Sequence, residues 1–263
     1  MSKIRLFYTL ISLIIILFCF LMIIIDSINY SLYLIISLTG LFLIFYMRII
    51  ELAKLTRVKH LHFTKCQPRK YLEEHQTLMS SFWLTKKQSK STKLFNVSVL
   101  LSFGEVYQAK QILDELSIKI SKLSNVELYW LLVGWFNYFE EINDLVKMEI
   151  FFLKICDLNY ILPHGFKQRT ENNFIKMQAR YFIHNGIYLD NAETIFNDSL
   201  KNRRYFINVL NSLYYLGLTA YKQNKKEVAL ERLNFVVQTK LSELSIYQRA
   251  KTLVEQISNE PTI

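Results

Sequence analysis

Residues 60–75 contain four side chains of the types that bind zinc, namely His60, His62, Cys66 and His75. A structural zinc site needs such ligands on one side of the ion. His60 and His62 are two positions apart, and on a helix residues at this spacing point to different faces. No C-x-x-C pair accompanies them. We therefore predict neither a metal site nor a cofactor, although zinc binding remains an alternative for this cluster.

Carboxylates that could act as general acid and base occur as adjacent pairs, Asp114-Glu115 and Glu140-Glu141. Adjacent side chains splay apart on a helix, so each pair predicts a solvated face. His164 has no evident partner in sequence. The chain contains no G-x-S-x-G, no P-loop, no G-x-G-x-x-G and no H-E-x-x-H. We predict that the protein is not an enzyme; an active site within a helical fold is the alternative.

Two uncharged stretches dominate the first fifty residues, Leu6–Ile25 and Tyr30–Met47, with a short polar turn at 26–29 between them. Twenty helical residues span about 30 Å, the thickness of the hydrocarbon layer. A secretory signal peptide would have a shorter apolar run and a cleavage site. Residues 1–50 therefore predict a transmembrane helical hairpin that contacts the membrane lipid bilayer.

The net charge of +10 is concentrated in one segment. Residues 48–93 carry eleven Lys or Arg against Glu51, Glu73 and Glu74, which gives +8, whereas residues 94–263 carry nineteen against eighteen acids. Basic flanks favour the cytoplasmic side. We expect a multi-pass protein of the cytoplasmic membrane with both termini inside, and the scattered Cys19, Cys66 and Cys156 fit a reducing compartment. The nearly neutral C-terminal part argues against nucleic-acid binding.

Residues 51–93 predict a basic juxtamembrane region. The membrane helix should continue until Pro68, a second helix should run over residues 69–84, and Thr85–Lys93 should form an exposed linker because it is rich in Lys and Ser. A generic flank that fixes topology is the favoured interpretation, and specific binding of lipid or nucleic acid is the alternative.

Residues 94–258 show apolar positions at helical spacing and an internal repeat. The stretch GEVYQAKQILDEL (104–116) matches NKKEVALERLNFV (224–236), with a turn residue, an Ala five positions later and a Leu four after that. Four helical hairpins are predicted, with an irregular connection at 159–170 and a capping helix near the end. The turns are Gly104, Gly186 and Asn224, and the small contact residues are Ala109, Ala192 and Ala229; the second hairpin has Val146 at that position, and the third has Arg180 where its first helix should carry Gly.

This pattern resembles the tetratricopeptide repeat family in degenerate form, over roughly residues 90–245. The resemblance implies an all-α fold, here a two-helix membrane hairpin followed by an α–α superhelical repeat domain whose first helices line a concave groove. Carried across from the family, the groove residues are Trp135, Tyr138, Phe139, Tyr181, His184, Asn185, Tyr214, Tyr221 and Lys222, with the plainer Leu94, Ser98, Leu101 and Ser102 in the first repeat. The alternative is that these aromatic side chains belong to the core.

From these features we predict a membrane-anchored cytoplasmic adaptor or scaffold that binds a protein or peptide partner through the groove. An accessory subunit of a membrane transporter or enzyme complex is one alternative, for which Ser37 and Gly40 offer a faint helix interface. A receptor for a short peptide is another. The sequence assigns neither the partner nor the oligomeric state.

Overall fold

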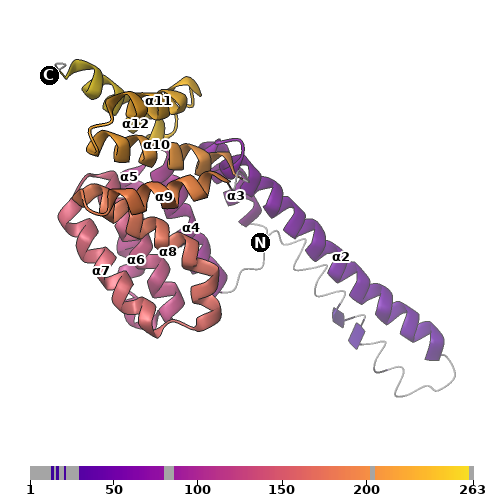
Figure 1. Cartoon of the computed structure of the whole chain (residues 1–263). Coiled ribbons are helices and arrows are strands. Elements are labelled where there is room, and N and C mark those ends of the chain that lie inside the picture. Colours follow the sequence, from indigo (N-terminus) through magenta and orange to yellow (C-terminus); the bar gives the residue numbers. More distant parts are fainter. Residues whose placement is uncertain are drawn as a thin grey trace. The chain divides into compact units, whose positions relative to one another are not determined.

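The computed structural model describes residues 13–14, 16–17, 21, 30–79, 86–201 and 205–260. The chain divides into two compact units: one holds α2 up to Leu61 together with α3, and the other holds His62–Pro68 and the chain from Thr85 onward. Every regular element in the described ranges is a helix (Figure 1). The all-α prediction is therefore confirmed.

The first unit is built from α2 (Tyr30–Phe63) and α3 (Pro68–Met79). The uncharged stretch Tyr30–Met47 forms the first half of α2, while Leu6–Ile25 lies almost entirely outside the described residues. Within those residues, no helix combines the length and the apolar character that crossing a bilayer requires.

Pro68 separates α2 from α3, but not as the stop signal of a continuous helix. The first helix ends at Phe63, a turn follows in which Cys66 has a φ of 52°, and Pro68 is the first residue of α3. Proline is favoured there because its missing N–H would be unpaired in any case. The helix predicted to end at residue 84 is described only to Met79.

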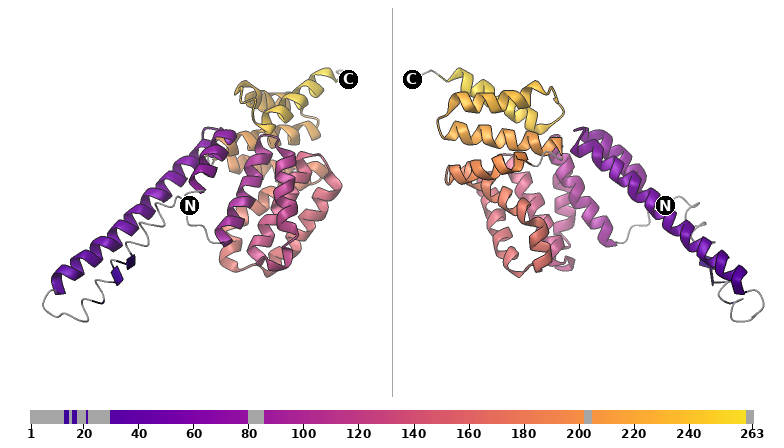
Figure 2. Two further views of the ribbon diagram at one scale, coloured as in Figure 1. Left: turned by 180° about the vertical axis from the view of Figure 1, so that it is seen from behind. Right: turned by 45° about the vertical axis from the view of Figure 1, so that its right-hand side comes forward.

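The second unit consists of helices that pack against their sequence neighbours in antiparallel pairs (Figures 1 and 2). The four hairpins are α4 (Lys86–Ser102) with α5 (Val106–Ser117), α6 (Asn125–Glu141) with α7 (Leu145–Ile161), α8 (His164–Asn185) with α9 (Leu189–Lys201), and α10 (Phe206–Lys222) with α11 (Lys226–Gln238). The last helix, α12 (Ser245–Asn259), packs on α11 and α10 and also contacts α4.

A residue with positive φ lies in each hairpin turn: Gly104 at 80°, Asn143 at 57°, Gly186 at 68° and Asn224 at 60°. Glycine and asparagine tolerate this left-handed backbone, which ends a helix by redirecting its last carbonyls. The turns predicted at Gly104, Gly186 and Asn224 are confirmed.

Small side chains allow close contact between the two helices in three of the four hairpins, since Ala109, Ala192 and Ala229 are fully buried. The assignment of Val146 to this position in the second hairpin is wrong: its side chain is 72% exposed, and Met148 is buried five residues after the turn. The period counted from Asn143 therefore matches that of the first and fourth hairpins.

Two predicted irregular segments are helical. The supposed linker from Thr85 to Lys93 forms the start of α4 from Lys86 onward, because helix propensity of Lys and Gln overrides their surface character. The supposed connection at 159–170 shrinks to Leu162 and Pro163, and α8 absorbs the long interval by extending to 22 residues. Both residues adopt extended backbone, as expected before and at a proline.

The C-terminal helix covers the last apolar face, as predicted. Its buried side chains are Ile246, Ala250, Leu253 and Ile257, preceded by the fully buried Leu244. They join one core cluster with α8, α9, α10 and α11. A repeat array needs such a cap because its terminal unit has no neighbour to cover it.

Candidate binding cavity

The second unit encloses a cavity of about 260 Å³ where the first helices of the hairpins converge. Its walls come from α4, α6, α8 and α10, from Phe196 of α9 and from the start of α12, with His62 and Phe63 from the same unit at one edge. Many of the lining side chains are polar. They include Asn137, Glu140, Glu141, Lys176, Arg180, Asn208, Asn211, Tyr215 and Arg249.

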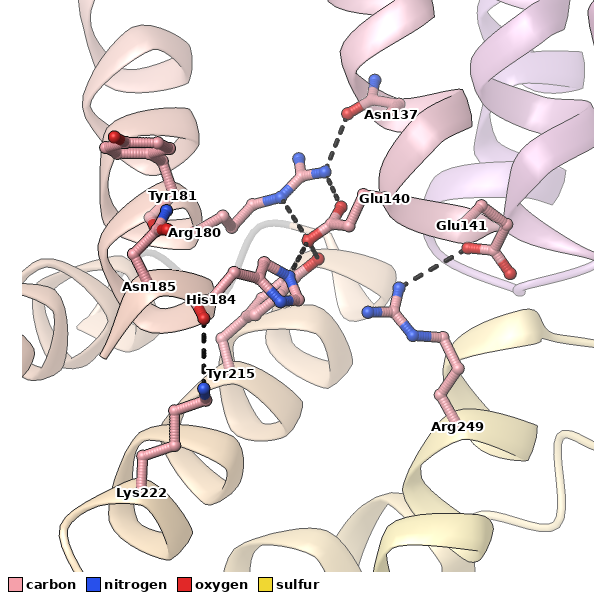
Figure 3. A network of polar contacts seen from close by, with 10 residues as sticks. All are labelled: Asn137, Glu140, Glu141, Arg180, Tyr181, His184, Asn185, Tyr215, Lys222 and Arg249. Atoms are coloured by element: carbon pink, nitrogen blue, oxygen red, sulfur yellow. Dashed lines mark hydrogen bonds and ion pairs between the residues drawn. The ribbon is translucent and has the colours of Figure 1, made fainter. Parts of the chain in front are cut away.

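Glu140 is the centre of this polar wall, with only 4% of the residue exposed. Its Oε1 accepts hydrogen bonds from the Tyr215 hydroxyl at 2.8 Å, from His184 Nε2 at 2.9 Å and from Arg180 Nε at 3.2 Å (Figure 3). Arg180 Nη2 also pairs with Oε2. One carboxylate thus joins α6, α8 and α10. The expectation that Glu140 belongs to a solvated face is wrong, because these partners replace its water.

The prediction that Arg180 takes the place of the repeat glycine is wrong. Ala179 is fully buried seven positions before the turn at Gly186, as Gly217 is before Asn224, and Arg180 is the next residue, directed at α6 and α10. Its guanidinium lies over the ring of Phe136, 4.8 Å from the centroid, and 5.5 Å from that of Tyr215. Nη2 donates to Asn137 Oδ1 at 2.9 Å. Burial lowers the pKa of Arg180, yet an arginine side chain stays protonated in proteins. The wide seam between α6, α8 and α10 is therefore filled by a buried ion pair.

His184 supplies a neutral donor to the same carboxylate. Burial, together with the nearby cations Arg249, Arg180 and Lys222, lowers its pKa to about 3. At neutral pH the ring is uncharged, so Nε2 must carry the proton that is shared with Glu140. The contact is thus a hydrogen bond to a carboxylate.

A second carboxylate, that of Glu141, links α6 to α12 by polar contacts. Glu141 accepts a hydrogen bond from the Ser245 hydroxyl and pairs with Arg249 Nη1 at 3.5 Å. The Arg249 guanidinium also lies 4.8 Å from the ring centroid of Tyr214. The adjacent residues Glu140 and Glu141 point apart, as helix geometry requires, but each finds a buried cation.

Three lining groups are not committed to the network. Lys176 lies one turn before Arg180 on α8, and Asn208 and Asn211 lie on α10. Among the described residues, none of these three side chains has a hydrogen-bond or ion-pair partner. Lys176 is half-buried, and burial lowers its pKa. The cavity therefore presents one ammonium and two amides to whatever enters it.

Of the predicted groove residues, Ser98, Leu101 and Ser102 of the first hairpin line this cavity, whereas the nine from the other three hairpins do not. Trp135 and Phe139 stack on Phe151 of α7, and Trp135 Nε1 donates to Ser117 Oγ at 3.0 Å. Tyr138 is buried beside both rings. These aromatic residues of α6 pack in the seams with the second helices, which agrees with the alternative of a core role.

The remaining predicted groove residues divide between the network and the surface. His184 joins Glu140, and Lys222 Nζ donates to the His184 carbonyl at 3.1 Å. Tyr181 stacks on Phe152, and its hydroxyl donates a hydrogen bond to Glu149 at 2.8 Å.

The other three predicted groove residues do not join the network around Glu140. Asn185 is exposed, and its Nδ2 donates to the Tyr181 carbonyl. The ring of buried Tyr214 lies against the Arg249 guanidinium, and the Tyr221 hydroxyl donates to Glu260. Figure 3 shows Tyr181 and Asn185 away from the carboxylate.

Sequence reasoning missed Glu140, Arg180, Lys176 and Tyr215. One signal was present, since Glu140 and Arg180 lie in otherwise apolar helical stretches, where a buried charge requires a partner. The other acidic pair behaves as expected, because Asp114 and Glu115 bind Lys110 and Lys93 on the surface. In the described part of the chain, no three His, Cys, Asp or Glu side chains are placed to hold a metal ion.

A scan against protein-family models found no match for this chain, and searches of curated proteins and of solved structures found none either.

Proposed function

We propose that this protein is a membrane-anchored adaptor whose tetratricopeptide-like unit binds a peptide segment of a partner protein in the polar cavity. The observation that carries the proposal is the convergence of four first helices and α12 on a cavity with uncommitted polar groups. Lys176, Asn208 and Asn211 are partly exposed on the wall of the cavity, so their polar groups are available to a ligand.

The chemistry of the cavity favours a peptide segment. With about 260 Å³, slightly less than small-molecule sites usually enclose, the cavity has room for one or two side chains of such a segment. The Asn208 and Asn211 amides can both donate to and accept from a peptide backbone. Lys176 would favour a segment with an acidic side chain, because its ammonium has no internal counter-ion among the described residues.

The membrane anchor is proposed from the sequence. Tyr30–Met47 contains no charged residue, and in helical form it would span about 27 Å. The basic residues that follow it favour a cytoplasmic location for the repeat unit. An adaptor of this kind would hold its partner at the inner face of the membrane.

The accessory-subunit alternative rests on Ser37 and Gly40 as a helix interface. A Cβ added to Gly40 would lie 3.3 Å from Cγ1 of Ile16, so Gly40 contacts the chain's own first apolar stretch, which supports the adaptor over this alternative.

Photo-crosslinking in the native membrane tests the proposal. A photoreactive phenylalanine at Asn211 should capture one protein, and Lys176→Gln should reduce its recovery. The control is the same residue at exposed Glu231 on α11. Equal capture of the same proteins from both positions would contradict a cavity site. Recovery of the chain in carbonate-soluble fractions would contradict the anchor.

A further inference from the structure

The groove between α2 and α3 has charged groups of both signs on opposite walls. Within the first unit, Lys54, Arg57 and Val58 of α2 face Glu73, Glu74, Thr77 and Leu78 of α3 across a space of about 470 Å³. Because a short turn joins the two helices and both line this groove, α3 runs back along α2. Its C-terminal end is therefore directed toward the uncharged half of α2.

The charges that face this groove do not neutralise one another directly. Among the described residues, the side chains of Lys54, Arg57, Glu73 and Glu74 have no ion-pair or hydrogen-bond partner. Lys54, Arg57 and Glu73 are exposed, and Glu74 is partly exposed. Two cations and two carboxylates thus stand on either side of an open space, above the buried Val58 and the partly buried Leu78.

The groove lies at a particular distance from the proposed membrane anchor. Lys54 follows Met47 by seven residues, about 10 Å along a helix, and Arg57 by ten residues, about 15 Å. The headgroup layer is about 5–8 Å thick on each side. Helical side chains tilt toward the N-terminus of their helix, which for α2 is the uncharged end, so both cations reach back toward that layer.

We infer that this groove binds the headgroup of phosphatidylethanolamine, a zwitterionic phospholipid with a primary ammonium; the inference rests on the proposed membrane anchor. Lys54 and Arg57 would hold the phosphate, and Glu73 and Glu74 would accept hydrogen bonds from the ammonium. A choline headgroup has no N–H to donate, and a glycerol headgroup has no cation for the carboxylates. The two-sided charge therefore selects one headgroup where a basic patch would select any anionic lipid.

Lipid retention by the full chain tests this inference. The protein is placed in nanodiscs that contain phosphatidylethanolamine, phosphatidylcholine and phosphatidylglycerol in equal amounts with identical acyl chains, then released and analysed by native mass spectrometry. Phosphatidylethanolamine should be retained about fivefold over phosphatidylcholine, which corresponds to about 1 kcal/mol. Equal retention of the three lipids, or a preference for phosphatidylglycerol, would overturn the inference.

Variants assign the preference to the groove. Glu73→Gln with Glu74→Gln should abolish discrimination between ethanolamine and choline while leaving the basic flank intact. Lys54→Gln with Arg57→Gln should reduce retention of both phosphatidylethanolamine and phosphatidylglycerol. Lys70→Gln, an exposed cation of α3 outside the groove, is the control and should change nothing. If the double glutamine variant of the acids keeps the preference, the groove is not the site.

The outcome is separable from that of the proposed function. Carbonate extraction reports the anchor, and crosslinking from Asn211 reports the cavity. A membrane-integrated protein without a headgroup preference refutes only the lipid site. A protein that fails to integrate refutes both proposals.

Discussion

Two regions of the repeat unit solve the same packing problem in opposite ways. In the fourth hairpin, Gly217 of α10 is so close to α11 that an added Cβ would lie 2.6 Å from Leu233 Cγ and 3.3 Å from the Ala229 carbonyl. Between the second and third hairpins, an ion pair of Arg180 with the buried Glu140 fills the space instead. The contact between α10 and α11 thus depends on close packing, and the contact between α6 and α8 depends on an ion pair.

The difference matters because helices joined by an ion pair pack less completely than helices in contact through small and apolar side chains. Side chains that satisfy one another by hydrogen bonds need fixed geometry and leave gaps that apolar side chains would fill. The cavity lies beside the Glu140–Arg180 pair, and the tightly packed fourth hairpin contributes only the face of α10 to it. The following predictions test this contrast.

Removing Arg180 should give the largest effect. Arg180→Ala leaves the Glu140 carboxylate buried without its main counter-ion, and we expect a loss of about 3–5 kcal/mol in the free energy of unfolding. Thermal and chemical unfolding of the full chain in detergent, followed by circular dichroism at a helical wavelength, measures it. The double variant Glu140→Leu with Arg180→Met should recover much of this loss. If it does not, the pair is not filling the seam as described.

Gly217→Ala should test the close packing of α10 on α11. The new methyl group meets Leu233 and the backbone of Ala229, so overpacking should cost about 1–3 kcal/mol despite the better helix propensity of alanine. Gly165→Ala is the matched control. No atom lies within 4 Å of its added Cβ, and the substitution should be neutral or stabilising by up to about 1 kcal/mol.

His184 should make the contact between α6 and α8 sensitive to acid. Its pKa is about 3 in the folded protein and near 6.5 when unfolded. The unfolded chain therefore takes up a proton first, and stability that is fully present above about pH 6.5 should fall as pH drops toward 3, by at most about 1.4 kcal/mol per pH unit. Buried His62, with a pKa lowered to about 4 by burial, contributes in the same window.

Comparison of His184→Gln with His164→Gln isolates the contribution of His184. His164 is exposed at the start of α8. Stability measured from pH 7 to pH 4 should fall less steeply for His184→Gln than for the His164 variant. Identical slopes would mean that His184 is not held neutral by its surroundings.

Substitution of Glu115 should have the smallest effect. Glu115 belongs to the other adjacent acidic pair and binds Lys93 at 2.6 Å, but both side chains are more than one third exposed. Solvent screens such pairs, so Glu115→Gln should change the free energy of unfolding by less than about 0.5 kcal/mol. Glu140→Gln, the same change in a buried setting, should cost several times more. Similar values for the two would remove the distinction between the pairs.

Sequence reasoning recovered the helical hairpins because their signals are local. A turn residue with positive φ, an alanine five positions later and helical apolar spacing act within one hairpin, as Gly104 with Ala109 and Asn224 with Ala229 demonstrate. The prediction at Val146 is wrong because no glycine marks the turn at Asn143, from which the period runs to Met148. The prediction at residues 86–93 is wrong because a composition rich in Lys and Ser is compatible with an exposed helix as well as with a loop.

The set of elements can be read from the sequence: uncharged stretches, a basic segment and paired amphipathic helices with their turns and cap. Which polar groups share a cavity depends on tertiary packing, since Glu140, Arg180 and Tyr215 lie 35 or more positions apart along the chain. Periodicity tells which face of a helix is buried. It does not tell which faces meet, because that depends on how successive hairpins rotate against one another.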